Sequence, residues 1–182
     1  MGKGMLETFL KRDNTTIVAA VRDTNSASSK ALLKLPTGTD SRVVLVKIDS
    51  VSETDAAAAV KELQASHGID HLDVVVANAA ISDAYHSAVE TPLEAFKRHM
   101  AVNAVGPLVL FQAVAPLLAK SKIEGLPKFV TINSAQGSIG EMDDFGAAPT
   151  TAYGCSKAAL NYMTRKIHYE HEKMISFALS PG

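Results

Sequence analysis

A tyrosine and a lysine lie four residues apart in "YGCSK", residues 153–157. The segment around them, 150–170, has a helical pattern, and on a helix this spacing places the Tyr153 phenol and the Lys157 ammonium on one face. Because a nearby positive charge favours the phenolate, we expect Lys157 to lower the pKa of Tyr153 from its usual value of about 10. Such a tyrosine can exchange a proton with a carbonyl or alcohol oxygen near neutral pH. A solvated surface pair is the alternative interpretation.

Three further polar residues are placed where they could serve the same chemistry. Ser134 ends the apolar segment "KFVTINS", and Asn78 ends the apolar segment "LDVVVAN". If both segments are parallel strands, these residues lie at the carboxyl edge of the sheet, where ligands bind in open α/β proteins. The Ser134 hydroxyl could then hydrogen-bond a substrate oxygen. Asn103 lies between two helical patterns, where its side chain could interrupt the helix and hold a water.

The elements that must position these residues alternate along the chain. Five nearly unbroken apolar segments, at 15–21, 42–48, 72–78, 128–133 and 174–180, predict strands that are covered on both faces. Helical patterns separate them at 52–68, 91–103 and 106–121, the first with Ser52 as its N-cap and Gly68 as its stop. We therefore predict a doubly wound, Rossmann-like α/β fold, a mostly parallel sheet with helices on both faces.

Length and composition narrow the class of protein. A chain of 182 residues predicts a single domain, 1–182, and its 47% hydrophobic and 20% charged residues are ordinary for a soluble protein. A net charge of -1 predicts no nucleic-acid partner and no anionic membrane partner. Cys155 is the single cysteine, and neither a signal peptide nor a membrane-spanning apolar run is evident. We expect a cytoplasmic protein.

Two other features predict little chemistry. The histidines and glutamates of "HYEHE", residues 168–172, have a spacing that could hold a metal, but no second ligand cluster is evident, so we predict no metal site. Cys155 has no base at a suitable spacing and is interpreted as a packing residue.

The motifs together resemble the short-chain dehydrogenase/reductase family over nearly the whole chain. "ANAA" at 77–80 stands where the family has N-N-A-G, and "SPG" at 180–182 resembles the Pro-Gly that follows the sixth strand. Asn103, Ser134 and the Y-x-x-x-K motif match the active-site residues of the family. The sequence is similar in detail to fungal ketoreductases of the norsolorinic acid reductase type.

The resemblance implies hydride transfer between a nicotinamide and a ketone or secondary alcohol. Tyr153 would be the general acid in reduction, Ser134 would orient the carbonyl oxygen, and Asn103 would support a proton-relay water. Lys157 would bind the nicotinamide ribose and favour the ionised tyrosine. The other residues implied to bind the cofactor are Gly2, Asp49, Ser50, Asn78, Ala79, Pro181 and Gly182, with Asp49 and Ser50 beside the adenine.

The residues after the first expected strand bear on the choice of cofactor. Doubly wound folds often place an acid there for a ribose 2′-hydroxyl, or an arginine nearby for a 2′-phosphate. Here Arg22 comes first and Asp23 follows. Because a guanidinium binds phosphate in a bidentate manner, we favour NADP over NAD, with a capping or surface arginine as the alternative.

The sequence also departs from the family pattern. Ala77 and Ala80 replace the first asparagine and the glycine of N-N-A-G. Gly2 matches the last glycine of the family's T-G-x-x-x-G-x-G turn, so we expect the first strand, most of this turn and the last strand to be lacking. Loss of the central first strand would leave unpaired strand edges within the sheet.

Three functional hypotheses follow. The first is an NADP-dependent ketoreductase acting on a small ketone or alcohol, aromatic or polyketide-derived, and forming a homodimer or homotetramer. The second is a truncated, non-catalytic subunit or regulatory remnant that dimerises through helices 105–120 and 151–169 without binding cofactor. The third, a flavodoxin-like nucleotide-binding protein, leaves Ser134, Tyr153 and Lys157 unexplained.

Overall fold

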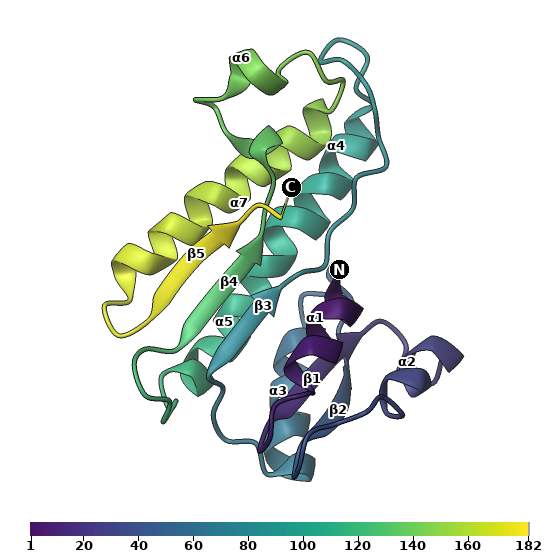
Figure 1. Cartoon of the computed structure of the whole chain (residues 1–182). Helices are drawn as coiled ribbons and strands as arrows, with labels where there is room; N and C mark the ends of the chain where they lie inside the picture. Colours follow the sequence, from purple (N-terminus) through teal and green to yellow (C-terminus); the bar gives the residue numbers. More distant parts are fainter. Residues whose placement is uncertain (182) are drawn as a thin grey trace. The chain divides into compact units, whose positions relative to one another are not determined.

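The computed structural model describes residues 1–181, with the side chain of Phe145 left out, and the chain forms two compact units, Met1–Ile69 and Asp70–Gly182. Each unit contains its own sheet with helices packed on it (Figure 1). Every strand pair in both sheets is parallel. The predicted parallel α/β fold is therefore confirmed, while the expectation of a single domain stays a prediction.

The first unit is built on a two-stranded sheet. Its elements are α1 (Gly2–Phe9), β1 (Thr16–Val21), α2 (Ala27–Leu32), β2 (Arg42–Lys47) and α3 (Asp55–His67). Val44 and Val46 of β2 pack against Ala59 and Leu63 of α3, and Val18 of β1 joins this cluster. Figure 1 shows α1 and α3 on opposite sides of the two strands, as a doubly wound arrangement requires.

The ends of α3 follow the local signals in the sequence. The N-cap is Thr54 and not Ser52 as predicted, but the Ser52 hydroxyl accepts the N–H of Asp55, the first residue of α3, at 3.1 Å. Gly68 adopts φ 66°, the left-handed conformation that ends many helices and that glycine reaches without steric cost. These two residues set the length of the helix.

The second unit carries the candidate catalytic residues on a three-stranded sheet. Its elements are β3 (Val74–Ala77), α4 (Leu93–Met100), the π-helical turn η1 (Ala101–Val105), α5 (Gly106–Leu118), β4 (Lys128–Ile132), the 3₁₀ turn η2 (Ala135–Gly137), α6 (Met142–Phe145), α7 (Thr151–Glu170) and β5 (Ile175–Leu179). The strand order is β3-β4-β5, so β4 is central. In this unit α5 packs on β3 and β4, and α7 packs on β4 and β5.

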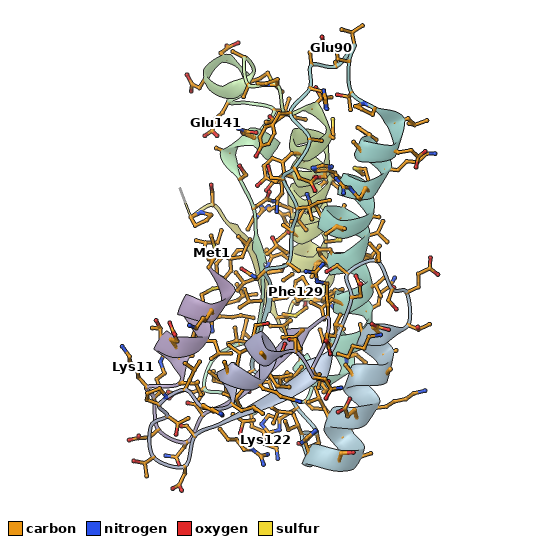
Figure 2. The ribbon with its side chains drawn as sticks, turned by 90° about the vertical axis from the view of Figure 1, so that its right-hand side faces the viewer. Met1, Lys11, Glu90, Lys122, Phe129 and Glu141 are labelled. Atoms are coloured by element: carbon orange, nitrogen blue, oxygen red, sulfur yellow. The ribbon has the colours of Figure 1, made fainter. Side chains whose placement is uncertain are left out.

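Aromatic and hydroxyl contacts fix the helices on the central strand. Phe129 of β4 is fully buried in the interior (Figure 2) and meets the ring of Phe111 on α5 at 5.0 Å, edge to face. On the other flank, the buried hydroxyls of Thr131 on β4 and Thr164 on α7 hydrogen-bond at 2.9 Å. The strand end that leads to Ser134 is therefore held by two helices.

The helical run Leu93–Leu118 is long and apolar enough to cross a membrane, by length and composition. The sequence pattern predicts no such run. Phe111, Val114, Leu117 and Leu118 are buried within the second unit, but only 33% of the apolar window is buried. Length and composition alone are weak evidence for a membrane span.

All five predicted strands and the four predicted helices are present within a few residues of their expected bounds. Three short helices, α1, α2 and α6, are not among these four. The N-terminus of α2 is capped locally, because the Ser26 hydroxyl accepts the N–H of Ser29 at 3.2 Å. The helix α6 forms within the segment between Ser134 and Tyr153, which we expect to be a loop. Neither has the apolar periodicity that makes a helix visible in sequence.

Candidate active site

The carboxyl ends of three strands meet at one edge of the second unit's sheet. Ala77 of β3 lies opposite Thr131 of β4, and Ile132 of β4 lies opposite Leu179 of β5. Three predicted site residues therefore leave the sheet at the same edge: Asn78 after β3, Ser134 after β4 and Pro181 after β5. Figure 1 shows α7 running alongside these strands.

Tyr153 and Lys157 lie on one face of α7, as their spacing predicts. The Lys157 Nζ is 5.6 Å from the centroid of the Tyr153 ring. The Lys157 side chain is only 2% exposed, and its Nζ donates a hydrogen bond of 2.8 Å to the carbonyl of Ile132. Since Ile132 is the last residue of β4, this bond ties the helix to the strand end two residues before Ser134.

Burial changes the acidity of this lysine. Desolvation disfavours the ammonium and lowers the pKa of Lys157 from 10.5 to about 8. The residue is still mostly protonated at neutral pH. Its ammonium has three N–H donors, of which Ile132 takes one, so two can reach a ligand. The surface-pair alternative is therefore wrong for Lys157.

Asn103 lies in the π-helical turn between α4 and α5, and its side chain is buried and bonded to protein groups. The amide oxygen accepts the N–H of Ile81 at 2.8 Å, and the amide nitrogen donates to the Ile81 carbonyl at 2.9 Å and to the Ser156 hydroxyl at 3.0 Å. These bonds occupy the amide and tie the loop after β3 to α7. Both partners are distant in sequence, and a water held by this side chain stays a prediction.

The backbone around Asn103 departs from α-helical hydrogen bonding. The helix widens into the π-turn η1, where the N–H of Gly106 donates to the carbonyl of Ala101. Residue 107 is a proline and has no N–H, so the Asn103 carbonyl lacks the donor that an α-helix supplies four residues on.

Ser134 begins the turn that follows β4. Its hydroxyl accepts the N–H of Gln136 at 3.3 Å, and its own N–H donates to the side-chain oxygen of Asn133 at 2.9 Å. The turn η2 packs directly on α7, because a Cβ added at Gly137 would lie 2.7 Å from both the carbonyl carbon and the Cβ of Lys157. The turn that Ser134 begins therefore packs against the helical turn that carries Lys157.

The loop after β3 is anchored on α4. Asp83 forms an ion pair of 2.6 Å with Arg98 and lies 3.6 Å from Nε2 of the buried His99. His99 uses its other ring nitrogen in a 2.8 Å hydrogen bond with the carbonyl of Ala95. Together with the Asn103 bonds to Ile81, these contacts fix the start of the loop.

Four residues that sequence reasoning did not single out support the site: Ile81, Asn133, Ser156 and Asn161. Ser156 also donates to the Tyr153 carbonyl at 2.7 Å, so it bridges Asn103 and the catalytic helix. Asn161 could have been found from the sequence, because it continues the four-residue spacing of Tyr153 and Lys157 along the same helix face. The other three give no such signal.

The remaining predicted cofactor residues divide between the units. In the first unit Gly2 begins α1, while Arg22 follows β1 and is exposed. Asp49 follows β2 closely, its carboxylate accepts the N–H of Val51 at 3.1 Å, and Ser50 comes next. In the second unit Ala79 is exposed beside the half-buried Asn78. Gly182 lies outside the described residues.

Comparison with known proteins places these residues in a family. The family model of the short chain dehydrogenases matches residues 1–180. The chain is 46% identical to the norsolorinic acid ketoreductase of Dothistroma septosporum and 44% identical to that of Aspergillus parasiticus, over its full length in both cases. It covers 67% and 66% of these relatives, so it spans about two-thirds of their length.

Solved structures agree on the fold. The NADPH-bound carbonyl reductase from chicken fatty liver superposes with a TM-score of 0.83 at 26% identity, covering 98% of this chain and 70% of that one. An NADH-dependent reductase complexed with NAD gives a TM-score of 0.81 at 18% identity, covering 100% of this chain and 74% of that one, and this likeness shows the fold alone. Relatives of this fold thus use either nicotinamide cofactor.

Proposed function

The chain belongs to the short-chain dehydrogenase family, and on that basis we propose that it is an NADP(H)-dependent ketoreductase, interconverting a ketone and a secondary alcohol. One observation carries the proposal: the buried Lys157 lies 5.6 Å from the Tyr153 ring and bonds to the end of the strand that leads to Ser134. The ketoreductase names of the relatives support the reaction class.

The chain's own residues would act on the carbonyl oxygen of the substrate. Tyr153 would donate its phenolic proton to this oxygen, and the Ser134 hydroxyl would hydrogen-bond the same oxygen as negative charge develops there. The Lys157 ammonium would stabilise the phenolate that remains. The cofactor supplies the hydride when bound. Proton return to Tyr153 would pass by way of a water on the Asn103 carbonyl.

The donors present fit a phosphorylated dinucleotide. The two N–H donors of Lys157 that Ile132 leaves free match ribose hydroxyls. Arg22 is exposed and, within residues 1–181, forms no ion pair, so its guanidinium is available to a 2′-phosphate. The carboxylate of Asp23, the residue that would favour NAD, already accepts the N–H of Asn25 at 2.8 Å. Of these groups, Arg22 supports NADP over NAD, whereas the second Asp23 oxygen stays free to accept a bond.

The rim of the site supports a bulky apolar substrate. Tyr85 and Val89 on the loop after β3, and Ile139 and Met142 after β4, are large apolar residues that are all more than half exposed. Figure 1 shows this loop and α6 at the same end of the second unit, where Figure 2 labels Glu90 and Glu141. Side chains of this kind suit an aromatic or polyketide-derived ketone, in keeping with the names of the relatives.

Two further properties belong to the proposal. We expect a homodimer or homotetramer, because large apolar side chains are exposed along these helices: Val105 on η1, Leu108 on α5, and Tyr162 and Tyr169 on α7. We also expect a cytoplasmic location. Sedimentation and imaging of a tagged chain would test these two expectations.

The test of the proposed function is cofactor binding followed by turnover. NADPH and NADH are titrated into the chain, and NADPH consumption is then followed with an aromatic ketone. We expect tighter binding of NADPH, turnover by the chain, and loss of turnover in Tyr153→Phe. The matched control is Tyr162→Phe, since Tyr162 lies on the same helix but is 74% exposed. Absence of binding by either cofactor would favour the non-catalytic alternative.

A further inference from the structure

Asn161 of α7 bonds to the chain on both sides of Ser134. Its side-chain oxygen accepts the Asn133 Nδ2 at 2.7 Å, and its side-chain nitrogen donates to the Gly137 carbonyl at 3.0 Å. Asn133 precedes Ser134 directly, and Gly137 ends the turn that Ser134 begins. A single amide thus joins the two ends of the segment 133–137 to the catalytic helix.

Asn133 passes this restraint to the backbone of Ser134. Its side-chain oxygen accepts the Ser134 N–H at 2.9 Å, while its own N–H donates to the Leu179 carbonyl of β5 at 2.8 Å. Asn133 is buried, so water competes little for these bonds. Asn161 and Asn133 therefore form a continuous hydrogen-bonded path from α7 to the backbone that carries the Ser134 hydroxyl.

The spacing on α7 relates this path to the catalytic pair. Tyr153, Lys157 and Asn161 are four residues apart, so they share one helix face. Lys157 bonds to the Ile132 carbonyl, and Asn161 bonds to the next residue and to the end of η2. One helix face thus carries the phenol and also fixes the segment 132–137 that carries the hydroxyl.

We propose that Asn161 is a positioning residue that sets the place of the Ser134 hydroxyl relative to the Tyr153 phenol. The proposal rests on the proposed function for its catalytic consequence. Asn161 does not touch the substrate in this account and acts only through Ser134. A misplacement of about 1 Å in a catalytic group can lower a rate by about a hundredfold. We therefore expect the loss of Asn161 to lower kcat.

The chain offers a matched control. Thr164 lies one turn further along α7 and bonds to Thr131 of β4 at 2.9 Å. This pair joins the same helix to the same strand and is fully buried, but it makes no bond to residues 133–137. Thr164→Val therefore removes a helix-to-strand hydrogen bond of comparable kind without releasing the segment that carries Ser134.

The first arm of the test measures hydrogen exchange of backbone amides in the ligand-free 182-residue chain. In Asn161→Ala, we expect the Ser134 and Gly137 amides to exchange about tenfold faster, while those of 128–131 are unchanged. Thr164→Val should leave the Ser134 and Gly137 amides unchanged. If Asn161→Ala does not fold, the isosteric Asn161→Asp removes the hydrogen-bond donor to the Gly137 carbonyl. In that variant the Gly137 amide should exchange faster than in the wild type. Equal exchange in wild type and both Asn161 variants would overturn the proposal.

The second arm is a double-mutant cycle on turnover. Asn161→Ala should lower kcat by about tenfold to a hundredfold with little change in the KM for NADPH. Because Asn161 acts through Ser134, the Ser134→Ala/Asn161→Ala double variant should be no slower than Ser134→Ala alone. If the double variant instead loses kcat by the product of the two single-variant losses, Asn161 does not act through Ser134 and the positioning role is overturned. A wild-type chain with no turnover would count against the proposed function, and the exchange arm would then decide the role of Asn161 by itself.

Discussion

Replacing Lys157 by methionine should stabilise the chain while abolishing its activity. Methionine has a similar length and no charge, so Lys157→Met removes the cost of holding an ammonium in a site that is 2% exposed. The cost follows from the pKa of Lys157, which burial lowers from 10.5 to about 8. At about 1.4 kcal/mol for each tenfold change in acidity, the buried ammonium destabilises the folded chain by about 3 kcal/mol at most.

The variant also loses an interaction, and the balance depends on pH. The hydrogen bond from the charged Lys157 to the buried Ile132 carbonyl is worth at least about 1.5 kcal/mol, so the net gain in unfolding free energy is at most about 1.5 kcal/mol at neutral pH. Because the folded pKa lies below the unfolded one, the wild type gains stability as the pH rises from about 8 to 10.5. Near pH 10, the free energy of unfolding of Lys157→Met should therefore be no higher than that of the wild type.

Urea unfolding followed by circular dichroism measures the difference in unfolding free energy between Lys157→Met and the wild type, at neutral pH and at about pH 10. The control is Lys166→Met on the same helix, whose ion pair with Glu170 is 2.7 Å long and exposed, so its unfolding free energy should change by less than about 1 kcal/mol. Destabilisation by Lys157→Met at neutral pH, or a gain that does not shrink toward pH 10, would refute the reasoning. NADPH consumption should be absent in Lys157→Met and unaffected in Lys166→Met.

Three other predictions can be checked with the same assays. Gly137→Ala should lower the unfolding free energy by about 1–3 kcal/mol, measured in urea, because the added Cβ would lie 2.7 Å from backbone and side-chain atoms of Lys157. The pH profile of kcat should fall above about pH 8 as Lys157 loses its proton, and a flat profile to pH 10 would contradict its charged role. Arg22→Ala should raise the KM for NADPH by about tenfold or more and leave that for NADH nearly unchanged, and equal effects on both would show that Arg22 does not select NADP.

Much of the fold was predictable because its signals are local. The apolar runs mark the strands, Ser52 and Gly68 mark the ends of α3, and the spacing of Tyr153 and Lys157 is set by helix geometry alone. The edge shared by Asn78, Ser134 and Pro181 follows from parallel pairing, which the alternation of strands and helices implies.

The parts that were not predictable depend on partners far apart in the chain. Asn103 bonds to Ile81 and Ser156, which lie 22 and 53 residues away, so the sequence could not show which groups its side chain contacts. Lysines are rarely buried, and nothing near Lys157 in the sequence indicates that its ammonium would donate a hydrogen bond to the Ile132 carbonyl. The link from Asn161 through Asn133 to Ser134 requires the fold before it can be seen.

Transfer of deuterium from labelled cofactor to product tests the central claim most directly. The chain is incubated with an aromatic ketone and NADPH that carries deuterium at the transferable position of the nicotinamide, and the alcohol is analysed by mass spectrometry. Our account predicts one deuterium at the carbinol carbon, and almost no product from Tyr153→Phe. Failure to form labelled alcohol, or undiminished transfer by Tyr153→Phe, would contradict it.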